Sequence, residues 1–277
     1  MTRSASGPTL YKMTGSGNDF VFLDGRETSL GEWTGARIVG ICDRRTGVGA
    51  DGVVLLDPEG PNDVRMHFYN SDGGRAAMCG NASLCSTRLA DRLGLLAAGA
   101  TLTLRTDAGD LHARCIGEHD RAEISLPAFA LPTTMPAIRL APGEQWIRYA
   151  LVGVPHLVVM VDDLEAVDLA HRGRELRHHP ALGDAGANVN FVALPSAGGV
   201  WPIRTYERGV EGETLACGTG TVAAAVATSP EAGGTLPAHF VSRGGYPLTV
   251  RALLTGDEAE QVWLEGQGRL VFTAVQA

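Results

Sequence analysis

One short pattern occurs twice in this chain, and it restricts the fold more than any other feature. The segments MCGN (78–81) and ACGT (216–219) each place Cys-Gly and a small polar residue before a stretch typical of a helix. The two cysteines, Cys79 and Cys217, lie 138 positions apart, which is half of the 277-residue chain. Similarity repeated at such an interval indicates a duplicated unit. We therefore expect two similar halves, each built around one of these helices.

The remaining sequence indicates many strands and few helices. Runs rich in Val, Leu and Ile, bounded by Gly, Pro, Asn or Asp, predict strands at 19–25, 52–58, 64–70, 100–106, 121–127, 156–162, 188–194, 201–207 and 246–254. Helices are predicted at roughly 31–43, 79–96, 162–175 and 217–229. The Pro-rich stretch 126–143 separates an N-terminal half (1–128) from a C-terminal half (129–263), and we expect a last strand at 264–277 to return to the first half.

Charge and hydropathy exclude several classes of partner. The net charge is −8 and no dense basic stripe occurs, which argues against nucleic acid and favours a small-molecule ligand. No apolar run approaches the roughly 18 residues of a membrane span. The first residues lack the apolar core of a signal peptide, so we expect a cytoplasmic protein without a disulfide framework among its five cysteines.

The chain contains a single lysine, Lys12, which limits cofactor chemistry. The surroundings of Lys12 match neither a phosphate-binding loop nor a Schiff-base setting, so we expect a solvated lysine near a strand end and no cofactor. The cysteine and histidine spacings do not fit a zinc site, and we expect no metal. Cys42, Cys85 and Cys115 are expected to be structural.

A cysteine at the start of a helix has chemical consequences. The first N–H groups of a helix carry partial positive charge, which favours a bound carboxylate and stabilises a thiolate. Two such sites, at Cys79 and Cys217, could hold the α-carboxylate of an amino acid. One thiolate could then remove the α-proton while the other thiol delivers a proton to the opposite face. This chemistry inverts the α-carbon and needs neither lysine nor metal.

An ordered set of motifs extends this reading to a family. These motifs are KMTGSGNDF (12–20), RRTGVGADG (44–52), YNSDGG (69–74), MCGN (78–81), GVPH (153–156), GANVNFV (186–192) and YERGVEGETLACGTG (206–220). In this order and spacing the chain resembles the diaminopimelate epimerases, amino-acid epimerases that work without pyridoxal phosphate. The resemblance implies an α/β (α+β) fold of two pseudo-symmetric halves, each a curved, mostly antiparallel sheet wrapped around a central helix, with the active site in the cleft between them. It also implies epimerisation of LL- and meso-diaminopimelate in the lysine and peptidoglycan precursor pathway, with a possible homodimer.

The resemblance assigns roles to individual residues. Cys79 and Cys217 match the catalytic pair, and His156 and Glu207 match positions that tune the thiols as charged neighbours. Arg208 matches the group that would pair bidentately with the distal carboxylate. The full set of implied substrate-binding residues is Asn18, Asn70, Gly80, Asn81, Asn190, Glu207, Arg208, Gly218 and Thr219.

Some positions depart from the family pattern and leave alternatives open. Val154 replaces an asparagine expected near the distal end of the substrate, and residues 82–84 read Ala-Ser-Leu in place of Gly-Ala-Arg. These changes leave open a racemase of another amino acid. A non-catalytic carboxylate-binding or thiol redox protein is the alternative of a different class. The strand end at Glu207 lies one residue farther from its cysteine than Asn70 does, which predicts an insertion around Glu211.

Overall fold

The computed structural model describes residues 7–117, 120–195, 198–229 and 236–276. The first six residues, where we expect no targeting segment, and Ala277, the last residue of the expected returning strand, lie outside these ranges. The described chain divides into two compact units, which we call the N-terminal unit (1–124 and 266–277) and the C-terminal unit (125–265). Each unit is treated separately.

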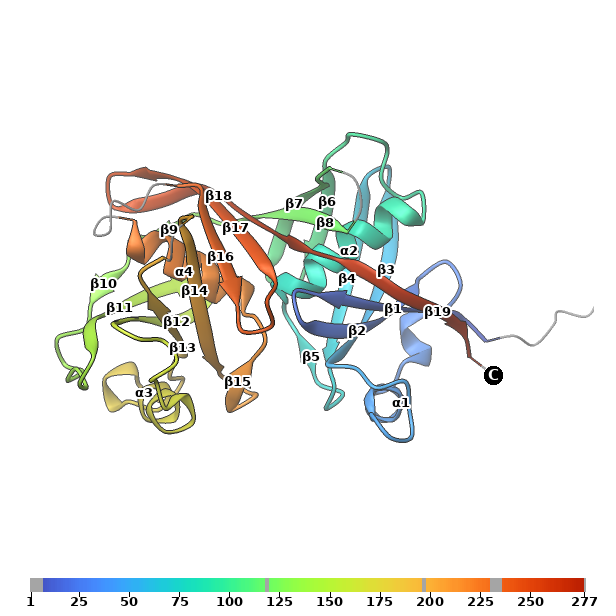
Figure 1. Ribbon diagram of the computed structural model, residues 1–277. Coiled ribbons are helices and arrows are strands. Elements are labelled where there is room, and N and C mark those ends of the chain that lie inside the picture. Colours follow the sequence, from blue (N-terminus) through green and yellow to red (C-terminus); the bar gives the residue numbers. More distant parts are fainter. Residues whose placement is uncertain (1–6, 118–119, 196–197, 230–235, 277) are drawn as a thin grey trace, which may run out of the picture. The chain divides into compact units, whose positions relative to one another are not determined.

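The N-terminal unit is a sheet that curves around one helix (Figure 1). Its strands are hydrogen-bonded in the order β19–β1–β2–β3–β4–β6–β7–β8, with β5 on β4, and only β2–β3 and β4–β6 among these pairs are parallel. The elements are β1 (Thr9–Gly15), β2 (Asn18–Asp24), η1 (Leu30–Glu32), α1 (Gly35–Cys42), β3 (Gly52–Gly60), β4 (Asp63–Asn70), β5 (Arg75–Ala76), α2 (Gly80–Arg92), β6 (Leu102–Thr106), β7 (Gly109–Cys115), β8 (Arg121–Leu126, which crosses the unit boundary) and β19 (Arg269–Val275).

The C-terminal unit repeats this arrangement around α4. Its strand order is β10–β11–β12–β13–β14–β16–β17–β18–β9 with β15 on β14, and the parallel pairs are β12–β13 and β14–β16. The elements are β9 (Phe129–Ala130), β10 (Thr133–Thr134), β11 (Glu144–Val152), β12 (Val154–Val161), η2 (Leu169–Gly173), α3 (Arg174–Arg177), η3 (Pro180–Leu182), β13 (Asn188–Ala193), β14 (Val200–Glu207), β15 (Gly212–Thr214), α4 (Gly218–Thr228), β16 (Ala238–Ser242), β17 (Pro247–Thr255) and β18 (Glu258–Gln267, which also crosses the boundary). The expected pair of similar, strand-rich halves is confirmed.

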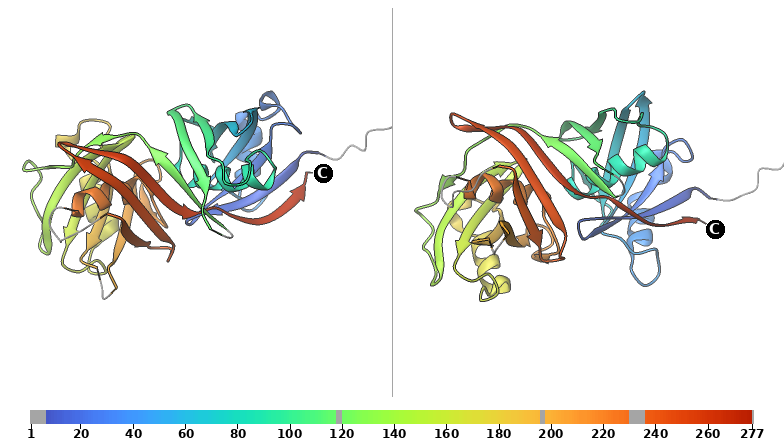
Figure 2. Two further views of the ribbon diagram at one scale, coloured as in Figure 1. Left: turned by 90° about the horizontal axis from the view of Figure 1, so that it is seen from above. Right: turned by 45° about the horizontal axis from the view of Figure 1, so that its top comes forward.

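Both central helices are buried although they contain hydroxyl groups. Helix α2 contacts β1, β2, β3, β4, β6, β7 and β19, and α4 contacts β11, β12, β13 and β17. In α2, Ser86 and Thr87 donate to the carbonyl oxygens of Ala82 and Ser83, each at 2.8 Å. These bonds along the helix satisfy the hydroxyls, so burial leaves no donor of these two side chains unpaired. Figure 2 shows the strands of each unit curving around its helix, and the red β19 beside the blue β1.

One expected helix is wrong in its position. The segment Asp162–Asp168 is not helical; the π-helical turn η2 begins at Leu169 and α3 ends at Arg177. Two aspartates account for the later start, because their side chains accept hydrogen bonds from nearby backbone N–H groups instead of continuing a helix. Asp163 accepts from Glu165 N at 3.0 Å, and Asp168 caps η2 by accepting from His171 N at 3.1 Å.

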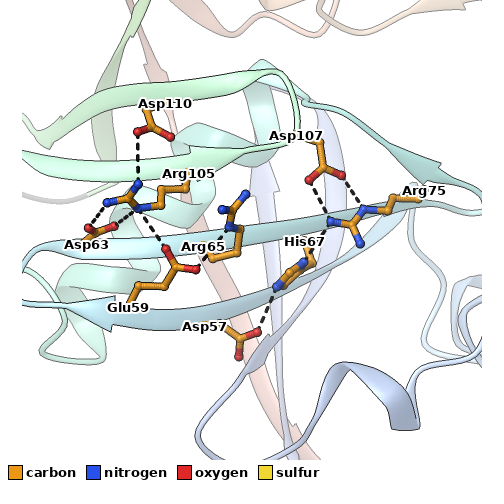
Figure 3. A network of polar contacts seen from close by, with 9 residues as sticks. All are labelled: Asp57, Glu59, Asp63, Arg65, His67, Arg75, Arg105, Asp107 and Asp110. Carbon is orange, nitrogen blue, oxygen red and sulfur yellow. Dashed lines mark hydrogen bonds and ion pairs between the residues drawn. The ribbon is translucent and has the colours of Figure 1, made fainter.

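The outer face of the N-terminal sheet carries a charged network (Figure 3). Along β4 the buried Val64 and Met66 alternate with Arg65 and His67, which face the network. Arg105 on β6 pairs with Asp63 Oδ2 at 2.6 Å, and His67 Nε2 lies 3.0 Å from Asp57 Oδ2. The alternation fixes which face of the sheet packs on α2, because a shift by one residue would bury these charges.

Candidate active site

The start of α2 places Cys79 at a helix N-terminus. Cys79 is the N-cap residue, with extended backbone angles (φ −140°, ψ 123°), and its side chain does not cap the helix. Gly80 and Asn81 follow in the first turn and are buried, whereas Cys79 is partly exposed. A thiol at this position lies where the helix dipole favours negative charge. The described geometry therefore matches the first of the two expected helix-start sites.

The turn between β1 and β2 supports this helix start. Asn81 Nδ2 donates to Asn18 Oδ1 at 2.6 Å, and Asn18 Nδ2 donates to Asp51 Oδ2 at 3.0 Å. Gly15 permits the approach, because a Cβ there would lie 2.5 Å from the Asn81 carbonyl oxygen. The structure thus brings the expected residues Asn18 and Asn81 together, and Gly15 is a contributor that the sequence analysis missed.

Lys12 is buried, which corrects the expectation of a solvated lysine. Its exposed fraction is 8%, and its ammonium lies 2.5 Å from Asp19 Oδ2 and also donates to the Gly49 carbonyl. Arg44 pairs with Asp19 at 2.6 Å and with Asp51 at 2.8 Å. Burial alone would raise the pKa of Asp19, but the bonds from Arg44 and Lys12 lower it overall. Lys12 therefore belongs to an ion-pair network behind the helix start.

Asn70 takes no part in this cluster. It ends β4, its N–H donates to the Gly74 carbonyl at 2.9 Å, and its carbonyl accepts from Gly73 N at 3.0 Å. Its side chain is exposed and makes no hydrogen bond within the described residues. Its expected contact with a ligand stays a prediction.

The start of α4 places Cys217 in the equivalent position of the C-terminal unit. Cys217 is the N-cap residue (φ −125°, ψ 111°) and is 9% exposed, and the helix begins at Gly218. Its Sγ lies 3.8 Å from Thr219 Oγ1, which lies 3.0 Å from His156 Nε2. The expected residues Cys217, Gly218, Thr219 and His156 therefore form one local cluster.

His156 is neutral, which corrects the expectation of a charged neighbour. It is fully buried on β12 between β11 and β13, and burial lowers its pKa to about 3, with a further lowering from the positive charge of Arg208. Asn190 Nδ2 faces His156 Nδ1 at 3.3 Å and donates to the Leu157 carbonyl at 3.0 Å. Because an amide N–H₂ can only donate, Nδ1 accepts and Nε2 carries the proton.

This tautomer sets the direction of the hydrogen bonds. His156 Nε2 donates to Thr219 Oγ1, which leaves the Thr219 hydroxyl proton available to Cys217 Sγ, 3.8 Å away. A sulfur that accepts this bond is stabilised in its thiolate form, as it is by the helix dipole. A neutral histidine in this position can influence the thiol through Thr219 but not by its own charge.

Asn190 is held inside the unit. It is 0% exposed, and its Oδ1 accepts from Thr205 Oγ1 at 3.0 Å. Gly220 lies directly against it, because a Cβ at that position would be 2.1 Å from Asn190 Oδ1 and 3.2 Å from Cys217 Sγ. Sequence reasoning missed Thr205 and Gly220. The signal for Gly220 was its place in the repeated cysteine segment, three residues after Cys217.

Glu207 and Arg208 lie where β14 ends, and both are half-buried. The Arg208 N–H donates to Asn188 Oδ1 at 2.8 Å. Asn188 was also missed, although it lies two residues before Asn190 on β13 and thus on the same face of that strand.

The other three cysteines lack the helix-start setting. Burial raises the pKa of Cys42 to about 11 and raises that of Cys85 and Cys115. None of the five cysteines, all within the described ranges, forms a disulfide. These three thiols are protonated near neutral pH and have the structural character expected of them.

Two general findings concern the described part of the chain. No helix there is long and apolar enough to cross a membrane. Over the same residues, no group of three or more His, Cys, Asp or Glu side chains could hold a metal ion.

Comparison with known proteins identifies the family. The diaminopimelate epimerase family model matches residues 10–125 and 148–250. The diaminopimelate epimerase of Gemmatimonas aurantiaca is 44% identical over 95% of this chain and 97% of its own, and that of Aquifex aeolicus is 37% identical over 95% of each. A Bacillus anthracis phenazine biosynthesis protein of the PhzF family shares the fold with a TM-score of 0.72 at 15% identity, covering 98% of this chain and 99% of that one. A hydroxyproline epimerase from Agrobacterium vitis does so with a TM-score of 0.65 at 19% identity, covering 99% and 93%. The chain belongs to the diaminopimelate epimerase family.

Proposed function

We propose that this protein interconverts LL- and meso-diaminopimelate by proton transfer at one α-carbon, in the supply of lysine and peptidoglycan precursors. The single observation that carries the proposal is the family membership at 44% identity over nearly the whole chain. The two cysteines that begin α2 and α4 supply the chemistry. The reaction as proposed uses no cofactor.

The proton balance follows from two thiols in opposite protonation states. A thiolate removes the α-proton and becomes a thiol, leaving an electron pair on the α-carbon. The other thiol gives its proton to the opposite face and becomes a thiolate. The inverted product therefore leaves the enzyme with the two protonation states exchanged, and the reverse reaction restores them.

The helix starts stabilise the charge that develops on the α-carboxylate. Backbone N–H groups near Gly80 and Gly218 lie at positive helix ends, and preorganised donors of this kind are worth most where water is excluded. Asn81 and Thr219 add polar groups beside them. We assign these four residues to the clamp on the reacting carboxylate.

We assign the resting thiolate to Cys217. Asn190 Nδ2 faces His156 Nδ1 and His156 Nε2 faces Thr219 Oγ1, and in this assignment the Thr219 hydroxyl donates to the Cys217 sulfur. In this assignment Asn190 and His156 are positioning residues, since both are 0% exposed. Cys79 is then the thiol that delivers a proton to the α-carbon in the turnover that starts from this protonation state.

The distal end of diaminopimelate carries a second amino acid group. Arg208 is the cation that we assign to its carboxylate, with Glu207, Asn18 and Asn70 as further polar contacts. Val154, at the start of β12, offers no hydrogen bond from its side chain, so the other groups have to suffice. Val154→Asn should change turnover by a factor equivalent to about 0.5–1.5 kcal/mol.

We further propose a cytoplasmic homodimer. Strand β19 pairs with β1 only, among the strands of the described residues, and Val271, Phe272 and Val275 on it are 46%, 45% and 59% exposed. An apolar edge strand of this kind invites pairing with another chain. Sedimentation of the wild type and of Phe272→Glu tests this: the variant should sediment as a monomer, and a monomeric wild type would contradict the proposal.

The test of function uses single cysteine variants. Cys79→Ala and Cys217→Ala should each lose epimerisation of diaminopimelate while keeping the circular dichroism and thermal unfolding of the wild type. Cys115→Ala is the matched control, because its thiol lies outside both helix starts and should be dispensable. Turnover close to wild type in either of the first two variants would refute the two-thiol assignment, and activity only on a monocarboxylic amino acid would refute the substrate.

A further inference from the structure

The loop that carries Arg208 is short and strained. Glu207 and Gly212 are the last paired residues of β14 and β15, so residues 208–211 make the whole connection. Gly209 and Glu211 both have positive φ, at 90° and 53°. The second value is unusual for a residue with a side chain. Such a conformation persists only where the surroundings hold it, so the contacts of Glu211 decide how firmly the loop is fixed.

The Glu211 carboxylate is the centre of those contacts. Its Oε1 accepts from Gly209 N at 3.1 Å and from Arg177 Nε at 3.1 Å, and its Oε2 lies 3.2 Å from His178 Nε2. Burial alone would raise the pKa of Glu211, but the Gly209 N–H and the charges of Arg177 and His178 lower it overall. The ionised side chain therefore ties the loop to the end of α3.

Arg177 is itself held rigidly. It is 8% exposed, and its Nη1 donates to the Ala185 carbonyl at 3.1 Å. Gly186, with φ 57°, makes room for it, because a Cβ there would lie 2.1 Å from Arg177 Nη1. The Ala187 N–H donates to the Arg177 carbonyl at 3.4 Å, and the next residue is Asn188.

Two contacts connect the loop to Arg177, one through Asn188 and one through Glu211. Asn188 holds the Arg208 N–H at 2.8 Å, and Glu211 holds the other end of the loop. On another side, a cleft of about 440 Å³ borders Glu211 and Gly212, so packed side chains do not support the loop there. The ion pair therefore holds the loop beside this cleft together with the backbone bond from Glu211 N to the Glu207 carbonyl at 2.8 Å.

We infer that Glu211 and Arg177 are positioning residues, which hold the 207–212 loop so that Arg208 meets the distal carboxylate of the substrate. This inference rests on the proposed function of Arg208. Glu211 lies in the connection for which the sequence analysis predicts an insertion of one residue relative to the N-terminal half.

The kinetic consequence is specific. Without the ion pair the loop populates conformations in which Arg208 does not meet the substrate. The apparent affinity for the substrate is then the intrinsic affinity multiplied by the fraction of molecules in the binding conformation. Bound substrate restores that arrangement through Arg208. Glu211→Gln should therefore raise the KM for diaminopimelate about five- to twentyfold, as expected for a lost charge-assisted contact, with kcat within about twofold of wild type.

The experiment compares four proteins with wild type in steady-state epimerisation of diaminopimelate. Glu211→Gln removes the charge with almost no change of shape and tests the inference. Arg177→Met should lose affinity for diaminopimelate, and Arg177→Lys, which keeps the positive charge, should lose less. The matched control is Glu175→Gln, which removes an exposed partner of Arg172 near the same helix and should leave KM unchanged. Thermal unfolding of every variant is recorded, because a purely structural role would lower kcat and unfolding temperature and leave KM unaltered.

The outcomes separate this inference from the proposed function. An inactive wild type refutes the proposed function and the inference with it. An active wild type with unchanged KM in Glu211→Gln refutes the inference alone. In an Arg208→Lys background, Glu211→Gln should have less effect on kcat/KM than in wild type, since both act on one contact. Equal effects in the two backgrounds would show that Glu211 does not act through Arg208.

Discussion

Gly220 gives the sharpest test of how the Cys217 site is built. Replacement of a helical glycine by alanine ordinarily stabilises a protein by about 0.5–1 kcal/mol. At Gly220, however, the new Cβ would lie 2.1 Å from Asn190 Oδ1. Asn190 cannot turn toward solvent, since it is 0% exposed. We therefore expect Gly220→Ala to have the opposite sign from an ordinary helix substitution.

The magnitude follows from the hydrogen bonds of Asn190. Its side chain bonds to the Leu157 carbonyl and to Thr205 Oγ1 at 3.0 Å each, and faces His156 Nδ1 at 3.3 Å. Displacing the amide breaks two or three bonds worth about 1 kcal/mol each, and the gain in helix propensity offsets part of this loss. The net destabilisation is about 2 kcal/mol, which lowers the thermal midpoint by about 4–8 °C in a protein of this size.

The assay is thermal unfolding beside a matched glycine. Gly40 lies on the exposed face of α1, and a Cβ there would meet no atom within 4 Å, so Gly40→Ala should raise the midpoint slightly. Gly220→Ala should also lose activity, because Asn190 and His156 shift together. A Gly220→Ala protein as stable as Gly40→Ala would refute the argument that buried Asn190 is fixed against the start of α4.

Three further predictions concern charge. The pKa of His156 falls from 6.5 to about 3 on folding, so as the pH drops the unfolded chain binds the proton first and the folded state loses stability between these two values. In His156→Gln the slope of the unfolding free energy against pH should therefore be smaller in this window by up to about 1.4 kcal/mol per pH unit. An unchanged slope would contradict the buried neutral state of His156. Arg208→Met should cost about 2–5 kcal/mol of transition-state binding, seen as a fall in kcat/KM for diaminopimelate, and an unaltered kcat/KM would remove Arg208 from the site. Asp19→Asn leaves the buried Lys12 ammonium without its carboxylate and should lower the free energy of unfolding in urea by about 3–5 kcal/mol. Asp110→Asn, in the exposed network of Figure 3, should lower it by less than about 1 kcal/mol. Equal losses in the two variants would contradict this ranking.

Local patterns explain which elements could be read from the sequence. The alternation along β4 follows from the pleat and the apolar run of β12 from burial on both faces, and each strand appears where expected. The repeated Cys-Gly pattern predicted the starts of α2 and α4, because a helix start is determined by a few neighbouring residues. By contrast, β11 and β7 carry many polar residues on one face, and neither was among the strands singled out.

Contacts distant in sequence explain what could not be read. The burial of Lys12 depends on the Gly49 carbonyl, 37 residues away. The neutrality of His156 depends on the strands packed on either side of it, and the need for Gly220 depends on Asn190 from another strand. Sequence spacing placed Cys79 and Cys217 at two helix starts, but it could not give the protonation state of the buried His156.

The position of a hydrogen isotope in the product shows whether two different thiols handle the proton. LL-diaminopimelate with protium at its α-carbons is converted by the wild-type enzyme in D₂O, and the meso product of the first few per cent of turnover is analysed by mass spectrometry. A thiol that delivers from the opposite face carries a solvent deuteron. We therefore expect one deuterium in essentially every product molecule, at the inverted carbon, and none in the recovered substrate. Product that retains the original protium at the inverted carbon would show that one group both removes and returns the proton, and would contradict the assignment of Cys79 and Cys217.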